Sequence, residues 1–145
     1  MWKLLMSGLL YVASGANGHA EGSVSRYGMG YGSGHDGFRP FDAVVREYNA
    51  SGDLFRIDGH CQSACTLFLA IRTVCITPAA QLLFHAGHTL GPERRISSGA
   101  THHMMSAYNE RLRTYLRDGG HMNSLEFHTI SGREMVRRFG YRACP

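Results

Sequence analysis

Residues 55–88 read FRIDGHCQSACTLFLAIRTVCITPAAQLLFHAGH, and this stretch decides the fold. Its alternation of apolar runs and turn residues predicts a short strand over 54–58, followed at once by a glycine turn. An apolar helix is expected over 63–70, and two short buried strands over 72–77 and 81–84 are separated by a proline-containing turn. Strands and a helix that follow one another so closely predict an α/β fold.

The rest of the chain continues this alternation. Apolar side chains at helical spacing predict a helix over 41–48, and the longest helical pattern covers 100–117. Glycine and proline residues predict a mobile loop over 86–99. A strand is expected over 125–130 and a short final helix over 133–139.

Length and composition predict one domain. The chain has 145 residues, of which 43% are hydrophobic and 18% charged, and this is enough to bury a core. Lys and Arg number 15 against 11 Asp and Glu, a net charge of +4. Because most of the basic clusters fall at helical spacing among polar residues, we interpret them as solvated helix faces and expect no nucleic-acid partner.

The first twenty residues differ from the rest. Lys3 precedes a mostly apolar run over 4–13, and small residues follow as far as Ala20. This layout predicts a signal peptide over 1–20, with a short buried helix as the alternative. The apolar run is too short to span a bilayer, so we expect no integral membrane segment after cleavage.

Residues 21–40 are rich in glycine and lack helical or strand periodicity, which predicts a flexible lead-in to an α/β domain over 41–145. Gly32, Gly34 and Gly37 match the spacing of a dinucleotide-binding loop. No strand is expected before them, however, so the sequence predicts no cofactor.

An even set of cysteines in an exported chain favours two disulfides over free thiols. Zinc is the competing interpretation, but the interval from Cys61 to Cys65 is looser than the pairs that structural zinc sites use. The connectivity cannot be read from spacing. We predict that Cys65 pairs with Cys75, which would tie the helix to the next strand, and that Cys61 pairs with Cys144. No metal site is expected.

Ser63 begins the predicted apolar helix, and His85 ends a predicted strand. The first N–H groups of a helix have no internal partner, so the Ala64 N–H is available to an oxyanion that forms when Ser63 attacks a carbonyl. A serine nucleophile needs a base, for which histidine is well matched. The alternative is structural, with Ser63 as a helix cap and His85 as a core histidine.

The motifs GHCQSACTLFL (59–69) and VCITPAAQLLFHAGH (74–88) resemble the Clp-protease/crotonase superfamily, and especially its small exported bacterial members of unassigned function. The likeness extends more loosely over 41–144. It implies a single-domain ClpP/crotonase-like ββα-spiral fold, with Ser63 at the nucleophile position and His85 at the base position.

The chain departs from the superfamily pattern at two points. The acidic residue that orients the histidine is expected around 127–130, where this chain has His128 and no carboxylate. The glycine pair that helps to form the oxyanion hole is replaced by Asp36-Gly37-Phe38, which leaves Gly37 as the candidate second donor.

Two functions are therefore expected. The first is a serine hydrolase of peptidase or esterase type, periplasmic or secreted from a bacterium, which uses Ser63 and His85 on an unknown peptide or ester. The second is a non-catalytic binding or assembly module with the same fold, stabilised by disulfides. Because superfamily members often form rings or trimers, the resemblance also allows a homo-oligomer.

Overall fold

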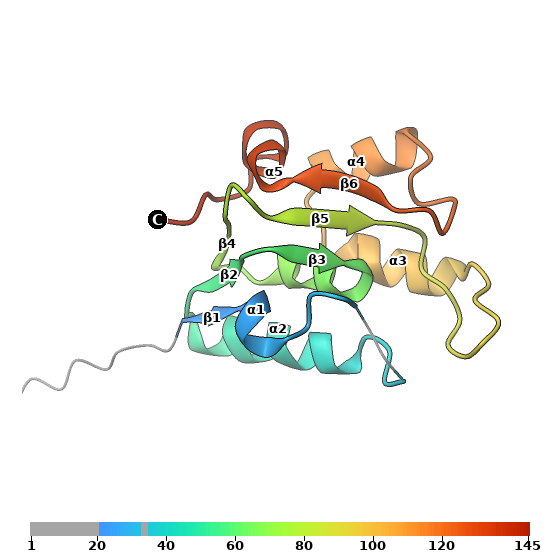
Figure 1. Ribbon diagram of the computed structural model, residues 1–145, viewed down its shortest axis with the longest axis horizontal. Helices are drawn as coiled ribbons and strands as arrows, with labels where there is room; N and C mark the ends of the chain where they lie inside the picture. The colour runs from blue at the N-terminus through green and yellow to red at the C-terminus, as the bar shows by residue number, and fades with distance from the viewer. Residues whose placement is uncertain (1–20, 33–34) are drawn as a thin grey trace, which may run out of the picture.

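Two small sheets form the frame of the molecule in the computed structural model, which describes residues 21–32 and 35–145 (Figure 1). The first sheet is wholly parallel, in the order β1 (Gly22–Ser23), β2 (Phe55–Ile57) and β4 (Val74–Ile76). In the second, the central strand β5 (Gln81–Phe84) pairs in parallel with β3 (His60–Gln62) and antiparallel with β6 (His128–Ser131). The chain is thus a mixed α/β domain.

The two sheets are linked by short steps. β2 passes into β3 through Asp58 and Gly59, where Gly59 has a φ of 140° that favours glycine. β4 likewise leads directly into β5. β3 and β5 pair in parallel with each other in the second sheet, as β2 and β4 do in the first. The 3₁₀ helix η1 (Ser63–Ala70) follows β3 and leads to β4, so it connects β2 and β3 to β4 and β5. This arrangement brings the ends of β3 and β5 to the same edge.

The core lies where η1 packs against its neighbours. Phe68 of η1 is fully buried, with ring centroids 5.5 Å from Phe41 and 4.7 Å from Phe55. Phe41 belongs to α2 (Arg39–Ser51), so these rings join the helix to the first sheet. Burying each ring contributes roughly 1.5–3 kcal/mol, which explains why a largely apolar η1 is found here.

The helix expected over 100–117 is two helices, α3 (Ser98–Ser106) and α4 (Glu110–Asp118). Asn109 ends the run, because its side chain accepts a hydrogen bond from the Leu112 N–H (3.0 Å) and donates one to the Phe139 carbonyl (2.7 Å). Phe139 ends α5 (Gly132–Phe139). An N-cap of this kind starts a new helix.

The glycine-rich segment is also more ordered than expected. Residues 22–27 form β1 and the short helix α1 (Val24–Tyr27), in place of an irregular lead-in. Gly22 packs directly against Tyr48, so that a Cβ there would lie 2.1 Å from the tyrosine oxygen, and Val24 is buried. A strand of two residues has no periodicity to detect. The predicted signal peptide lies outside the described residues.

The predicted disulfide pairing is wrong. In the described part of the chain, the bridges are Cys61–Cys65 and Cys75–Cys144, with Cα–Cα distances of 5.2 and 4.8 Å. The turn at Ser63 folds η1 back against β3 and brings the first pair together. The C-terminus adds to the edge of β4, where the Cys144 N–H donates to the Ile76 carbonyl (3.1 Å), and this contact aligns the second pair.

Among the described residues, no helix has both the length and the apolar character that crossing a bilayer requires.

Candidate functional site

Ser63 occupies an unusual backbone conformation at the junction of β3 and η1. Its φ is 54°, and within the described residues it is the only residue other than glycine with a positive φ. This left-handed conformation is unfavourable for an L-residue by about 1–2 kcal/mol. Such strain concentrates at functional sites, and hydrolase nucleophiles commonly stand on a sharp turn between a strand and a helix.

Three contacts hold this turn. The Cys61–Cys65 disulfide closes across it. The Gln62 N–H donates to the Gly30 carbonyl (2.8 Å), and the Gln62 amide donates to the Tyr31 carbonyl (2.9 Å). At Gly32 the N-terminal segment passes so close that a Cβ would lie 3.2 Å from the Ser63 Cβ. The segment that the sequence left unassigned therefore forms one wall of the site.

The start of η1 is suited to hold negative charge. No side chain caps it among the described residues, so its first N–H groups, including that of the buried Ala64, precede any intrahelical bond. The Ser63 carbonyl accepts a hydrogen bond from the hydroxyl of Thr66 (2.7 Å). The Thr66 hydroxyl accepts one in turn from the hydroxyl of Tyr108 (2.6 Å). Burial raises the pKa of Tyr108, so this phenol remains a neutral donor.

His85 follows the last residue of β5 and is fully buried. Neither ring nitrogen has a hydrogen-bond partner in the part of the chain that the structure describes. Its ring is met edge-on by Phe127, with centroids 4.8 Å apart, and is stacked at 5.8 Å on His88. Burial, together with electrostatic interactions with His88 and Arg94, lowers the pKa of His85 to about 4, against a smaller opposing effect of the Ala86 backbone. The imidazole is therefore neutral at pH 7.

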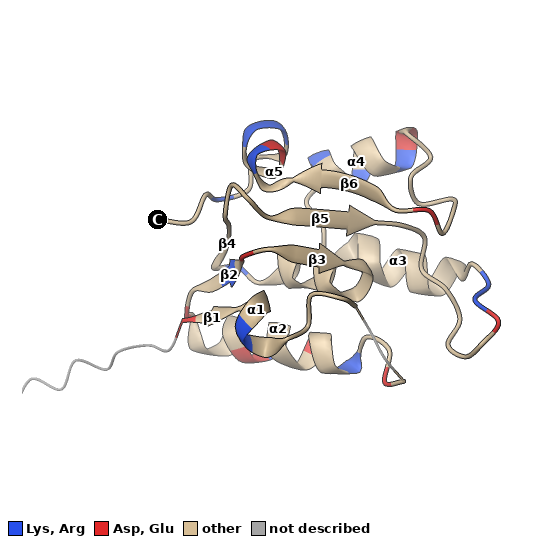
Figure 2. Cartoon of the chain, viewed as in Figure 1, with Lys and Arg blue, Asp and Glu red and all other residues tan. Residues whose placement is uncertain are grey.

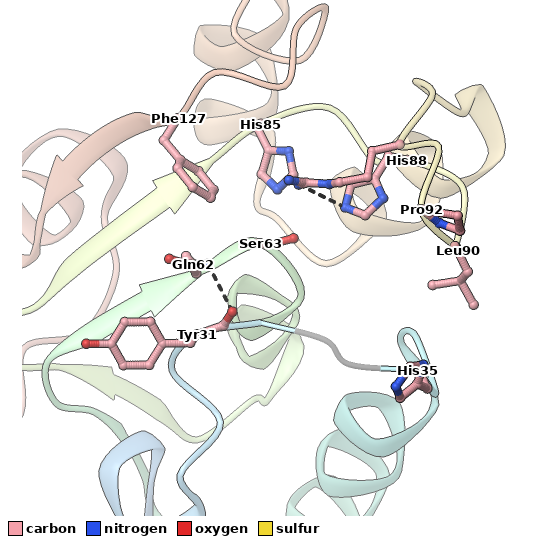
Figure 3. Close-up of a pocket in the computed structure, with 11 residues that line it drawn as sticks. Tyr31, His35, Gln62, Ser63, His85, His88, Leu90, Pro92 and Phe127 are labelled. Atoms are coloured by element: carbon pink, nitrogen blue, oxygen red, sulfur yellow. Dashed lines mark hydrogen bonds between the residues drawn. The ribbon is translucent and has the colours of Figure 1, made fainter.

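Ser63 and His85 line the same cavity, which has a volume of about 700 Å³. Figure 3 shows His85 and His88 along one side, Gln62 and Tyr31 along the other, and Ser63 between them. No hydrogen bond joins Ser63 to His85 in the described structure. Catalytic hydrogen bonds are often open in a free enzyme and close with substrate, so this geometry is compatible with a base and a nucleophile.

Phe127 lies edge-on against the His85 ring, and no carboxylate among the described residues hydrogen-bonds to this ring. His128 points elsewhere, because its Nε2 shares a hydrogen bond with the Tyr115 hydroxyl (2.9 Å) and its ring stacks on His121 with centroids 3.5 Å apart. Burial and the charge of His121 lower the pKa of His128. No acidic side chain contacts His85 among residues 21–32 and 35–145.

Gly37, the candidate second oxyanion donor, is buried with a φ of 58°. It lines a smaller cavity of about 220 Å³ to which Ser63 also contributes. A Cβ at Gly37 would meet Leu90 at 3.4 Å. The two residues thus face a common space, although the structure records no direct contact between them.

No set of three or more His, Cys, Asp or Glu side chains within the described ranges is arranged to hold a metal ion.

The chain matches no protein-family model, no curated protein and no solved structure. The superfamily resemblance of the two motifs therefore stays an expectation.

Several residues of the site were not predicted. Tyr31, Leu90 and Arg94 line the large cavity but come from segments without periodicity. Only the nearby motif His85-Ala86-Gly87-His88 marks this region in the sequence, because it places two histidines at the end of an apolar strand.

Proposed function

We propose that this protein is a serine hydrolase of peptidase or esterase type, with Ser63 as nucleophile and His85 as general base. The observation that carries the proposal is the strained, left-handed backbone of Ser63 beside a cavity that it shares with His85, which is fully buried and makes no side-chain hydrogen bond among the described residues. A helix cap would need neither feature. Strain of this kind persists only where the surrounding structure enforces it.

The reaction would follow the usual course for acyl transfer. His85 accepts the hydroxyl proton as the Ser63 oxygen bonds to the substrate carbonyl carbon, which forms a tetrahedral oxyanion. The Ala64 N–H, with Gly37 as the second donor, would stabilise this charge. Protonated His85 then gives its proton to the leaving amine or alcohol, whose bond to carbon breaks. Water enters by the same steps in reverse and releases the acid.

The environment of His85 sets the properties of this pair. A pKa of about 4 keeps the base unprotonated at neutral pH, but it also makes the imidazole a weak proton acceptor. Because no carboxylate among the described residues lies in position to stabilise the imidazolium, its charge would be balanced mainly by the oxyanion that forms with it. We therefore expect a slow dyad enzyme rather than a fast triad enzyme.

The chain topology supports a ClpP/crotonase-like spiral as the fold. β2 and β3 lead into η1, and β4 and β5 then repeat the two-strand step beside them. The loop from β5 leads into α3, which packs on η1. These are the units of a ββα arrangement.

Export to the periplasm or the exterior is supported by chemistry. Two disulfides are compatible with an oxidising compartment, where such bonds persist. The signal-peptide pattern of residues 1–20 points to the same destination.

The alternative is a binding or assembly module. Phe127 in place of an acid favours it, as does the exposure of three large apolar side chains around the cavity: Tyr31, Leu90 and Phe127. Exposed apolar residues that gather at one place commonly mark a binding surface.

Labelling with an alkyl fluorophosphonate tests the enzyme directly. We expect the oxidised protein to be labelled at Ser63, and the labelling to be lost in Ser63→Ala and at least a hundredfold slower in His85→Ala. Ser98→Ala and His102→Ala are the matched controls, because both residues are exposed and outside the cavities. Labelling of a folded protein at other serines only, or none at all, would favour the binding module.

A further inference from the structure

The loop between β5 and α3 is folded into a defined shape rather than left mobile. Thr89 organises it, since its N–H donates to the Arg95 carbonyl (2.8 Å) and its hydroxyl donates to the Glu93 carbonyl (2.9 Å). His88 pairs with Ile96 in a short antiparallel bridge, and the Ser97 N–H donates to the Gly87 carbonyl (2.8 Å). The loop is thus closed by its own backbone, and the position of Arg94 within it is set.

Arg94 turns back from this loop toward the cavity. Its guanidinium donates to Nε2 of His88 (3.3 Å), while Nδ1 of His88 donates to the Thr89 carbonyl (2.8 Å). These two bonds require a neutral His88 with its proton on Nδ1, because Nε2 must accept. A neutral imidazole satisfies one N–H of the guanidinium but leaves its positive charge uncompensated.

No carboxylate neutralises Arg94 within the described residues. Figure 2 shows both signs of charge on the loop, because Glu93 adjoins Arg94 and Arg95. The one acidic residue on the cavity walls, Asp36, is already paired with Arg39 at 2.7 Å. Among the described residues, the large cavity therefore presents a guanidinium that hydrogen-bonds to His88 but forms no ion pair with a carboxylate.

The two cavities meet at Ser63, and both are lined mainly by apolar surface. The larger one also contains Arg94 and His85, whereas the smaller one is lined by Phe38, Leu90 and Met104 among others. Ser63, His88 and Leu90 belong to both. A molecule that spans the two would place a bond near the Ser63 hydroxyl, with one end against an arginine and the other in an apolar pocket.

We infer that Arg94 forms an anion-binding subsite, and that the substrate carries a carboxylate on one side of the cleaved bond and an apolar group on the other. This inference rests on the proposed hydrolase function and names its substrate class. The guanidinium offers the paired donors that match a carboxylate. Binding there would also offset a charge that disfavours protonation of His85.

Two fluorophosphonates of equal chain length test the subsite, one ending in a carboxylate and the other in a methyl group. A hydrogen-bonded ion pair with a guanidinium changes binding by about tenfold. We expect the carboxylate probe to label Ser63 about ten times faster than the methyl probe in the native protein. Arg94→Gln should remove this preference, so that the two probes label at equal rates, whereas Arg95→Gln should keep it.

Equal rates for the two probes in the native protein, or a preference that survives Arg94→Gln, would overturn the subsite. If neither probe labels a folded protein, the hydrolase proposal has failed, and the subsite is then tested alone. Sodium hexanoate would be titrated while the ring signals of His88 are followed by NMR. Saturable shifts that disappear in Arg94→Gln support the anion site, and unchanged signals reject it.

Discussion

Replacing Ser63 with glycine and, separately, with alanine measures the strain in its backbone. Both variants remove the hydroxyl, for which the structure shows no hydrogen bond to His85, so they differ only in the Cβ. At an ordinary φ, alanine is more stable than glycine by about 0.4–1 kcal/mol, because glycine has more conformational freedom in the unfolded chain. The left-handed φ of 54° reverses this order.

The magnitude follows from two opposing effects. The glycine variant avoids the conformational penalty of about 1–2 kcal/mol that a left-handed backbone imposes on alanine. The alanine variant loses less conformational entropy on folding and buries part of one more carbon, and these two effects together favour it by roughly 1 kcal/mol. We expect Ser63→Gly to be more stable than Ser63→Ala by up to about 1 kcal/mol. For a domain of this size, each kcal/mol corresponds to roughly 2–4 °C in Tm.

The assay is urea unfolding of the oxidised variants, compared at equal slope. Labelling with the fluorophosphonate should be absent from both. The sign of the difference is decisive, since an alanine variant more stable than the glycine variant would mean that residue 63 is not left-handed. In that case, the strongest argument for a nucleophile at this position would be lost.

Three further results are expected. Removing the Cys61–Cys65 bridge should destabilise the protein by about 2 kcal/mol, and removing the Cys75–Cys144 bridge should destabilise it by about 4 kcal/mol, because the bridged residues are 4 and 69 positions apart and the longer loop costs more entropy to close. Urea unfolding that ranks the two losses of stability in the opposite order would contradict this. His85 binds a proton more readily in the unfolded chain, where its pKa is near 6.5, than in the folded protein, where its pKa is about 4. The stability that neutral His85 contributes is therefore complete above pH 6.5 and is lost as the pH falls toward 4, by up to roughly 3 kcal/mol. His85→Gln should flatten the dependence of the unfolding free energy on pH between pH 4 and 7, whereas the control His102→Gln should not. Asn109→Ala should lower stability by about 1–2 kcal/mol, because α4 loses its N-cap, and should leave the rate of fluorophosphonate labelling unchanged. A lower labelling rate in this variant, but not in the exposed control Asn123→Ala, would mean that the break between α3 and α4 shapes the cavity.

The parts of the fold that sequence predicts well are those with a local signal. β2, β4 and β5 fall within the expected strands, and η1 has the expected bounds, because apolar runs between turn residues fit only a buried element. The helix over 100–117 was overextended for an instructive reason. Met104, Tyr108, Leu112 and Leu116 are all buried at intervals of four, so the periodicity continues across a break that only the Asn109 contacts reveal.

Some residues of the candidate site could likewise be predicted from local sequence patterns, and others could not. Ser63 and His85 were identified from their places beside a helix start and a strand end, and both line one cavity. The wall made by residues 30–32 was not foreseeable, since it depends on hydrogen bonds to β3 from a segment without periodicity. The same holds for Arg94, whose position depends on the closure of its loop by Thr89.

The amino-acid sequence was enough to predict an α/β domain, the order of most of its strands and helices, and the serine and histidine on which its proposed chemistry depends. These follow from polarity patterns that act over a few residues. Three features became visible only in the folded chain: which cysteines pair, the left-handed backbone of Ser63, and the contact of Phe127 with His85. Each of these depends on contacts between segments that are distant in the chain or on a turn that those contacts enforce, and such contacts leave no periodic trace in the sequence.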